Sequence, residues 1–154
     1  MSLWVMQVRL PAVEAIVQAS PEAVFEWVTA FKENTTGGGS RVLSTEDNGD
    51  LIVEFVTVVF GLMGRRKVHR TVERVTLESP NEVRFQGVKG PLSVLRDRFT
   101  LQEVEGGTQF RYESTVGLPG SILGWLLCQT YVRALLGRFM RQHVDKIRDH
   151  FTTT

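Results

Sequence analysis

The spacing of turn signals between Arg41 and Val116 constrains the fold of this chain more than any other feature. Segments rich in Val, Ile, Phe and Thr alternate there with short turn-like stretches: "EDNGD", "FGLMG", "ESPN", "VKGP" and "VEGGT". Asn48-Gly49 is the strongest hairpin signal among them. No helical pattern of about 10–15 residues separates two segments, so the sequence predicts about six successive strands in an antiparallel meander and excludes a parallel doubly wound sheet.

Before this meander, the sequence predicts one strand and one or two short helices. The strand spans Met6 to Ala19, is rich in Val and Ile, and is interrupted at Pro11. Ser20 is a good N-cap and Pro21 suits the first helical position. The apolar residues that follow at helical spacing are Val24, Phe25, Val28 and Phe31. The next stretch, "KENTTGGGS", predicts a loop or one ragged helical turn, because consecutive glycines disfavour a regular element.

After Pro119 the pattern predicts a long helix from Ser121 to about Phe151. Arg133, Arg141 and Arg148 lie on its polar side. Its apolar stripe comprises Trp125, Val132, Leu136, Phe139, His143 and Ile147.

The first turns of this helix, "SILGWLLC", are apolar on every side. A helix that is apolar all round must be covered all round, by a loop, a partner chain or a lipid surface. We therefore expect Trp125 to point inward, and Leu123 and Leu127 to meet that second covering.

Three stretches carry a resemblance to a known family: "ASPEAVFEWV", "FTLQEVEGGTQFRYEST" and "GLPGSILGWLLCQTYVRALLGRFMRQHVDKIRDHF". Together with the element order, they resemble the SRPBCC superfamily, which includes START domains and birch-pollen-allergen-like proteins, and in particular its polyketide cyclase/dehydratase-like branch. The resemblance implies a single α+β helix-grip domain over residues 1–154. An antiparallel sheet of about seven strands would curve around the C-terminal helix, with short helices after the first strand and a cavity between sheet and helix.

Composition excludes several classes of function. A net charge of +1 makes nucleic acid an unfavourable partner, and the single cysteine, Cys128, allows neither an internal disulfide nor metal-ligand spacing. The longest apolar stretch, "LIVEFVTVVFGLM", contains Glu54 and is shorter than the about 20 residues that cross a bilayer. No secretory signal is visible. We expect a cytoplasmic protein with no transmembrane segment, no metal and no cofactor.

The alternation of the predicted strands and the helical stripe together define the expected ligand-binding residues. Phe110, Tyr112 and Ser114 share one face of the last strand, which should face the helix. The full predicted set is Phe85, Phe99, Phe110, Tyr112, Ser114, Trp125, Val132, Leu136, Phe139 and His143.

Four residues are candidates for acid–base chemistry: Asp97, Tyr112, His143 and His69. Asp97 is expected opposite Val116, where a carboxylate among apolar residues either has a raised pKa or caps backbone groups near residues 120–121. Tyr112 either orients a ligand oxygen or is a core tyrosine. His143 lies on the apolar face of the helix, as an acid or base or as a satisfied core histidine, and His69 could face either side.

The run "GRRKVHRTVER" could meet phosphates or an anionic membrane surface, but the alternating charges of a solvent-facing strand look the same, and we favour the strand. The neighbouring third strand, "LIVEFVTVVF", is largely apolar on both faces, which predicts either an outer covering or a homodimer contact.

Three functions follow from these patterns. The favoured one is binding or carriage of a small hydrophobic molecule, such as a lipid, a polyketide or an aromatic metabolite. The second is a polyketide cyclase/dehydratase-like enzyme that uses the four acid–base candidates. The third is a protein interaction module with a closed core, with a possible homodimer through the third strand or the start of the C-terminal helix, and transient membrane-surface contact there.

Overall fold

The computed structural model describes residues 5–31, 33–34, 38–60, 64–90, 92–119 and 122–152. The chain begins with β1 (Val5–Arg9), β2 (Val13–Val17), α1 (Pro21–Val28), β3 (Glu33–Asn34) and β4 (Gly38–Thr45). It continues with β5 (Leu51–Phe60), β6 (Arg66–Glu78), β7 (Glu82–Lys89), β8 (Val94–Val104) and β9 (Gly107–Pro119). It ends with α2 (Ile122–Leu127), a π-helical turn η1 (Cys128–Val132) and α3 (Arg133–Thr152).

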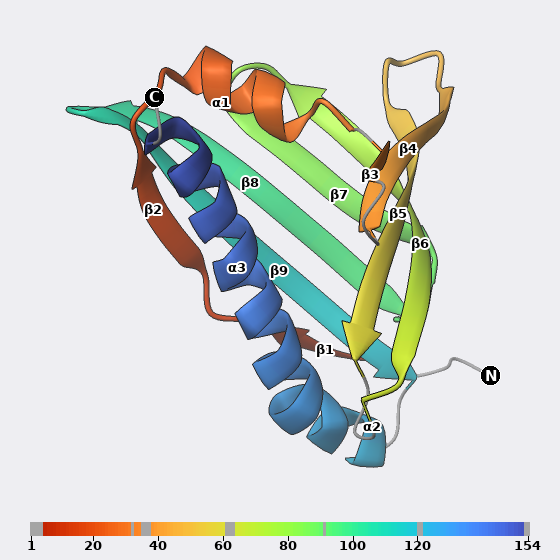
Figure 1. The fold of residues 1–154 in the computed structure, drawn as a ribbon. Coiled ribbons are helices and arrows are strands. Elements are labelled where there is room, and N and C mark those ends of the chain that lie inside the picture. The colour runs from red at the N-terminus through yellow and green to blue at the C-terminus, as the bar shows by residue number, and fades with distance from the viewer. Residues whose placement is uncertain are drawn as a thin grey trace.

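The strands form one curved antiparallel sheet in the order β1-β9-β8-β7-β6-β5-β4-β3, with β2 also paired to β9 (Figure 1). The predicted helix-grip fold is therefore confirmed, including six successive strands from β4 to β9. The sheet has more strands than the predicted seven for two reasons. The first predicted strand divides into β1 and β2 around Pro11, which has no N–H for the ladder, and the two-residue β3 adds an edge strand.

Helix α1 begins where the sequence predicts. The Ser20 hydroxyl accepts a hydrogen bond from the Ala23 backbone N–H at 3.2 Å, and Pro21 occupies the first turn. Val24 and Phe25 of α1 are buried, and the helix crosses one end of the sheet over β8 and β9 (Figure 1). A second short helix is absent from the described residues, because residues 33–34 and 38–45 pair as strands β3 and β4 instead.

The C-terminal helix differs from the prediction in one respect: a π-helical turn separates α2 from α3. A π turn holds one more residue than an α turn, which rotates the residues before it by about 100° relative to those after it. The Thr130 hydroxyl within this turn donates to the Leu126 carbonyl at 2.7 Å. A regular 3.6-residue pattern therefore places the residues of α2 on the wrong side of the helix.

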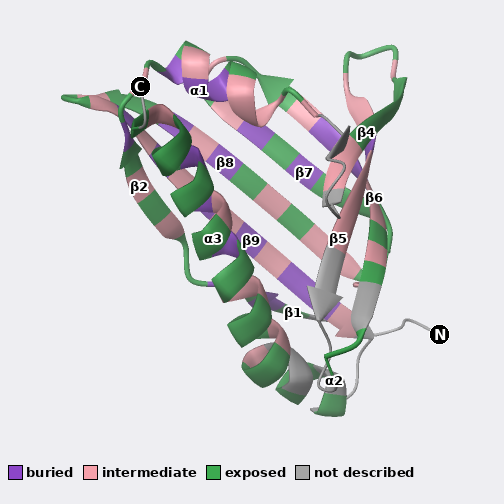
Figure 2. Cartoon of the chain, in the orientation of Figure 1, coloured by how far each residue is buried: buried purple, intermediate pink, exposed green. Residues whose placement is uncertain are grey.

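The core lies between the inner face of the sheet and the second half of α3. Buried residues alternate with more exposed ones along β7, β8 and β9, so one face of these strands forms the core (Figure 2). Met140, Val144 and Ile147 of α3 are buried against that face. Helix α3 packs chiefly on β2 and only slightly on β9, and its described contacts with β5, β6 and β7 are slight or absent.

The outer face of β5 and β6 carries ion pairs between charged residues that alternate with apolar ones, such as Val56 opposite Arg70 and Val72 opposite Glu54. Glu54 contacts Arg41 at 3.4 Å and Arg70 at 3.3 Å, and Arg74 contacts Glu46 at 3.0 Å. Arg70 and Arg74 thus occupy a surface strand face, as favoured for the basic run. The predicted homodimer contact through this strand stays a prediction.

Candidate functional site

Asp97 is held on the inner face of the sheet by two hydroxyl groups. The Tyr112 hydroxyl donates to one carboxylate oxygen at 2.9 Å, and the Ser114 hydroxyl donates to the other at 2.5 Å. Burial raises the pKa of Asp97, and the bonds from Ser114 and Tyr112 partly offset that increase. This network anchors a desolvated carboxyl without any charged partner among the described residues.

The register of Asp97 differs from the predicted one. Asp97 lies opposite Ser114, whereas Val116 lies opposite Leu95. The β8–β9 hairpin closes through the two residues between Val104 and Gly107, a tighter turn than the prediction assumed. Because the shift is by an even number of residues, Asp97 keeps its predicted face and gains Ser114 as a direct partner.

Glu73 is a second inner-face carboxyl, which is absent from the four acid–base candidates predicted from the sequence. It lies on β6 opposite Val53 of β5 and Gly87 of β7, and it is only 6% exposed. Burial and the nearby negative charge of Asp97 raise its pKa to about 8, while a long hydrogen bond of 3.5 Å from the Thr71 hydroxyl opposes that rise. The available signal was the alternation on β6, which puts Glu73 with Val75 on the face opposite Arg70 and Arg74.

His143 of α3 lies directly over this wall. Its ring stacks on Phe99 with centroids 5.6 Å apart, and it meets Tyr112 edge-on at 6.0 Å. Burial, with a smaller effect from the charge of Lys146, lowers the pKa of His143 to about 4. The imidazole is therefore neutral at neutral pH and can accept a hydrogen bond there.

An unbroken row of aromatic rings crosses the inner face from β5 to β9. Phe55 lies 6.1 Å from Phe85, Phe85 lies 4.8 Å from Phe99, and Phe99 lies 5.0 Å from Phe110 and 4.8 Å from Tyr112. The two carboxyls therefore project from a wall that is otherwise mainly apolar.

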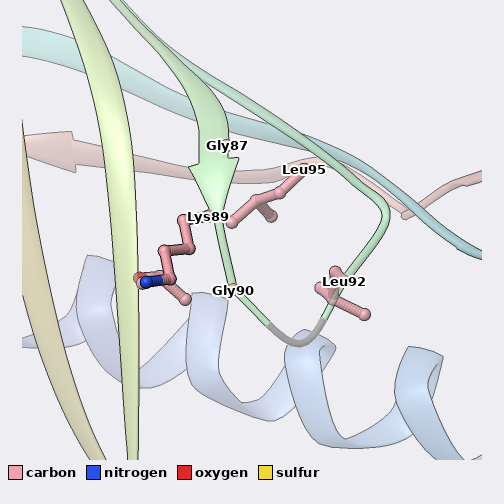
Figure 3. Close-up of a pocket in the computed structure, with 6 residues that line it drawn as sticks. Gly87, Lys89, Gly90, Leu92 and Leu95 are labelled. Carbon is pink, nitrogen blue, oxygen red and sulfur yellow. The ribbon is translucent and has the colours of Figure 1, made fainter.

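A small pocket of about 10 Å³ borders the inner face where β6, β7 and the start of β8 meet (Figure 3). Its size is that of about one water molecule. Gly87 lacks the side chain that would press on Leu95, because a Cβ there would lie 3.1 Å from the Leu95 Cβ. The lining residues are Thr71, Gly87, Lys89, Gly90, Leu92 and Leu95.

Residues 12–152 match the family model described as polyketide cyclase / dehydrase and lipid transport. The chain belongs to this family. No curated protein matches the chain.

Solved structures share the fold at low sequence identity. The Zhui aromatase/cyclase from Streptomyces sp. R1128 has a TM-score of 0.72 and 12% identity, over 97% of this chain and 94% of that one. A START superfamily protein from Mycobacterium smegmatis has a TM-score of 0.67 and 14% identity, over 95% and 97%. The di-domain ARO/CYC BexL from the BE-7585A biosynthetic pathway has a TM-score of 0.73 and 16% identity over 96% of this chain, which spans only 51% of that protein.

Within this family member, the fold brings three of the four acid–base candidates together. Tyr112 joins them, because its hydroxyl bonds Asp97 and its ring contacts His143. His69 is not joined to them by any interaction in the described part of the chain. It lies half-buried on β6, opposite Thr57. The roles of all four residues in catalysis stay predictions.

The expected ligand-binding residues divide into two groups. Phe85, Phe99, Phe110, Tyr112 and Ser114 are buried on the inner face, and Val132 and Leu136 pack against the core from the helix. Phe139 is 42% exposed, although its ring stacks on His143 at 6.3 Å. Their contact with a ligand stays a prediction.

The expectation that Trp125 points inward is wrong. Trp125 is 37% exposed and lies outside the core, because the π-helical turn rotates α2 relative to the stripe of α3. Leu123 is 68% exposed, so no described element covers it, and the side chain of Leu127 lies outside the described residues. The membrane-surface and homodimer contacts expected at this end of the helix stay predictions.

Among the described residues, no helix is long and apolar enough to span a membrane. That part of the chain also contains no group of three or more His, Cys, Asp or Glu side chains placed to hold a metal ion.

Proposed function

We propose that the chain binds a small hydrophobic molecule between the inner face of the sheet and α3. The aromatic row from Phe55 to Phe110 is the observation that carries this proposal. Helix α3 packs chiefly on β2 and only slightly on β9, and Phe55 of β5 and Leu95 of β8 are inner-face residues that stay half-buried. An apolar wall beside a few fixed polar groups is the usual composition of a ligand site.

The partial exposure of the apolar side chains along this wall supports the proposal. Phe55, Leu95 and Leu136 are only half-buried, although they pack against the core. Covering such apolar surface stabilises a complex by about 25 cal/mol per Å² removed from water, before the costs of association. The family description covers both cyclase and lipid transport, and both activities need a hydrophobic ligand in such a site.

We expect Leu136→Trp to weaken binding of the neutral fluorophore Nile red by about tenfold or more, because the larger side chain at this half-buried position would compete with the ligand for contact with the wall. Leu135→Trp is the matched control, since Leu135 is the adjacent residue and is exposed. Fluorescence titration measures both variants, and mass spectrometry of gently purified protein identifies any apolar molecule that co-purifies. Equal affinities for the two variants, or no saturable binding by the unmodified chain, would contradict the proposed site.

A cyclase/dehydratase-like reaction is the second candidate, and the contact of Asp97 and His143 with the same tyrosine favours it. A neutral imidazole can accept a hydrogen bond from a bound molecule, and a carboxyl with a raised pKa can exchange a proton with it. If the chain changes its ligand chemically, His143→Gln should co-purify with a compound whose mass differs from that of the wild-type ligand. Identical compounds in both extracts would argue for carriage alone.

A further inference from the structure

Both carboxyls on the inner face lack a cationic partner. None of the ion pairs formed by the described residues includes Glu73 or Asp97. The hydrogen-bond donors that reach them are the neutral hydroxyls of Thr71, Tyr112 and Ser114. A desolvated carboxylate without a counter-cation is costly, so this arrangement favours a positive charge supplied from outside the chain.

Glu73 is the less satisfied of the two. More than nine-tenths of the residue is buried, but its Oε1 atom, which has no hydrogen-bond partner among the described residues, remains accessible, because no buried side-chain oxygen there lacks a partner. Its other oxygen has only the 3.5 Å contact with Thr71, at the outer limit of a hydrogen bond. On the same face, Gly87 lies directly opposite Glu73 and contributes no side chain. Two residues that line the small pocket are neighbours of Glu73: Thr71 bonds its carboxyl and Gly87 lies opposite it, and the pocket has room for a group about the size of one water molecule.

Aromatic rings flank the two carboxyls. Phe85 lies opposite Asp97 on β8 and opposite Val75 on β6, the inner-face residue next to Glu73. The ring of Phe85 contacts the ring of Phe55 on one side and the ring of Phe99 on the other. Aromatic faces attract cations, so rings and carboxyls here favour the same kind of group.

The other titratable groups around Glu73 do not supply a positive charge, so the site still favours a cation from outside the chain. The residues opposite it on β5 and β7 are Val53 and Gly87, which carry no charge. From β8 and β9 it faces Asp97 and Tyr112, the latter with a pKa raised well above 10 by burial. From α3, His143 over this wall is neutral, and Lys146 beside it is exposed.

Lys89 lines the small pocket, but its side chain is exposed, and it forms no ion pair with Glu73 in the described part of the chain.

We propose that the ligand of this site carries a protonated amine, which binds between Glu73 and Asp97 against the ring of Phe85. This inference rests on the proposed function, because it specifies the polar end of the hydrophobic molecule. The hydrocarbon part lies along the aromatic row, and Glu73 is the residue that selects the charged nitrogen over a hydroxyl or carbonyl oxygen.

Binding of an amine at Glu73 should release a proton, which can be measured. With its pKa near 8, Glu73 is mainly protonated at neutral pH in the free protein. An ammonium ion beside it favours the ionised form. Binding therefore converts the carboxylic acid and the ammonium into a carboxylate–ammonium pair and releases the acid proton to the buffer, up to one proton per ligand.

The test uses two aromatic probes of the same shape, naphthylmethylamine and naphthylmethanol. Calorimetric titrations at neutral pH, in two buffers of different ionisation enthalpy, report both affinity and proton release. We expect the unmodified chain to bind the amine about tenfold or more tightly than the alcohol, with proton release for the amine alone. Glu73→Gln should abolish the proton release and reduce the preference to about threefold or less.

Glu54→Gln is the matched control, because Glu54 lies on the neighbouring strand on the outer face, paired with Arg41 and Arg70. It should retain both the preference and the proton release. The proposal is overturned if the alcohol binds as tightly as the amine, if no proton is released, or if Glu54→Gln and Glu73→Gln behave alike. In each of those outcomes the proposed function still stands as long as the alcohol binds saturably. Failure of both probes to bind would overturn the proposed function itself.

Discussion

Replacing Glu73 with glutamine should stabilise the protein at alkaline pH and change little in acid. The folded-state pKa of Glu73 is about 8, against 4.5 for the unperturbed group, because burial and Asp97 oppose its ionisation. Its contribution to stability is fully present below about pH 4.5 and is lost as the pH rises through 8. Since one pKa unit corresponds to about 1.4 kcal/mol, the gain from Glu73→Gln should reach about 3–5 kcal/mol above pH 8.

Urea denaturation at about pH 5 and about pH 9 measures this difference, since the free energy of unfolding can be extrapolated at each pH. The titration of His143 does not affect the difference expected at about pH 9. Its lowered pKa makes stability fall only as the pH drops from 6.5 toward about 4, the opposite slope in a lower window. Glu54→Gln should show no comparable alkaline gain. If Glu73→Gln is no more stable than the unmodified chain at about pH 9, the buried carboxyl is not desolvated as described.

Gly107→Ala should be the most damaging single-methyl substitution at the hairpin between β8 and β9. Gly107 has a φ of +143°, and a Cβ there would lie 2.0 Å from the carbonyl oxygen of Val17 and 3.2 Å from the Ala19 backbone nitrogen. Both contacts are with backbone, so relief requires the end of β2 to move away from β9. We expect a loss of about 3–5 kcal/mol in the free energy of unfolding.

Gly106→Ala is the control for this prediction. Gly106 also has a positive φ, of +89°, but nothing lies within 4 Å of the position of its missing Cβ. It should cost only about 1–2 kcal/mol, the strain of a left-handed backbone. Equal losses for the two variants, measured by urea denaturation, would show that the contact between Gly107 and the end of β2 is unimportant.

The chemistry of the inner wall could be predicted in part. The alternation of β8 and β9 correctly places Asp97, Tyr112 and Ser114 on one face with Phe99 and Phe110. Glu73 was not predicted because Arg70 and Arg74 lie close to it in sequence. A charged residue within a run of charged residues is expected to be exposed to solvent. The burial of Glu73 depends on packing against β5, β7 and β8, and the sequence of β6 alone does not predict that packing.

The C-terminal helix was also predicted only in part. Helical periodicity correctly placed Ile147 on the buried stripe of α3, but it missed Met140 and Val144. It also placed Phe139 and Trp125 on that stripe, and both are exposed. A single π-helical turn changes the phase of everything before it, and a sequence pattern of fixed period cannot register such a turn.

The sequence by itself determined the order of elements along the chain, the antiparallel meander and the apolar character of the inner face, and its resemblance to a known family implied the helix-grip fold. The features read from the residues depend on local signals: turn residues, alternation along strands and caps at helix ends. Only the tertiary structure decided that Glu73 and Asp97 share one wall, that Tyr112 joins Asp97 to His143, and that Trp125 lies outside the core. Those outcomes depend on strand register, helix phase and desolvation, which arise only when distant segments pack together.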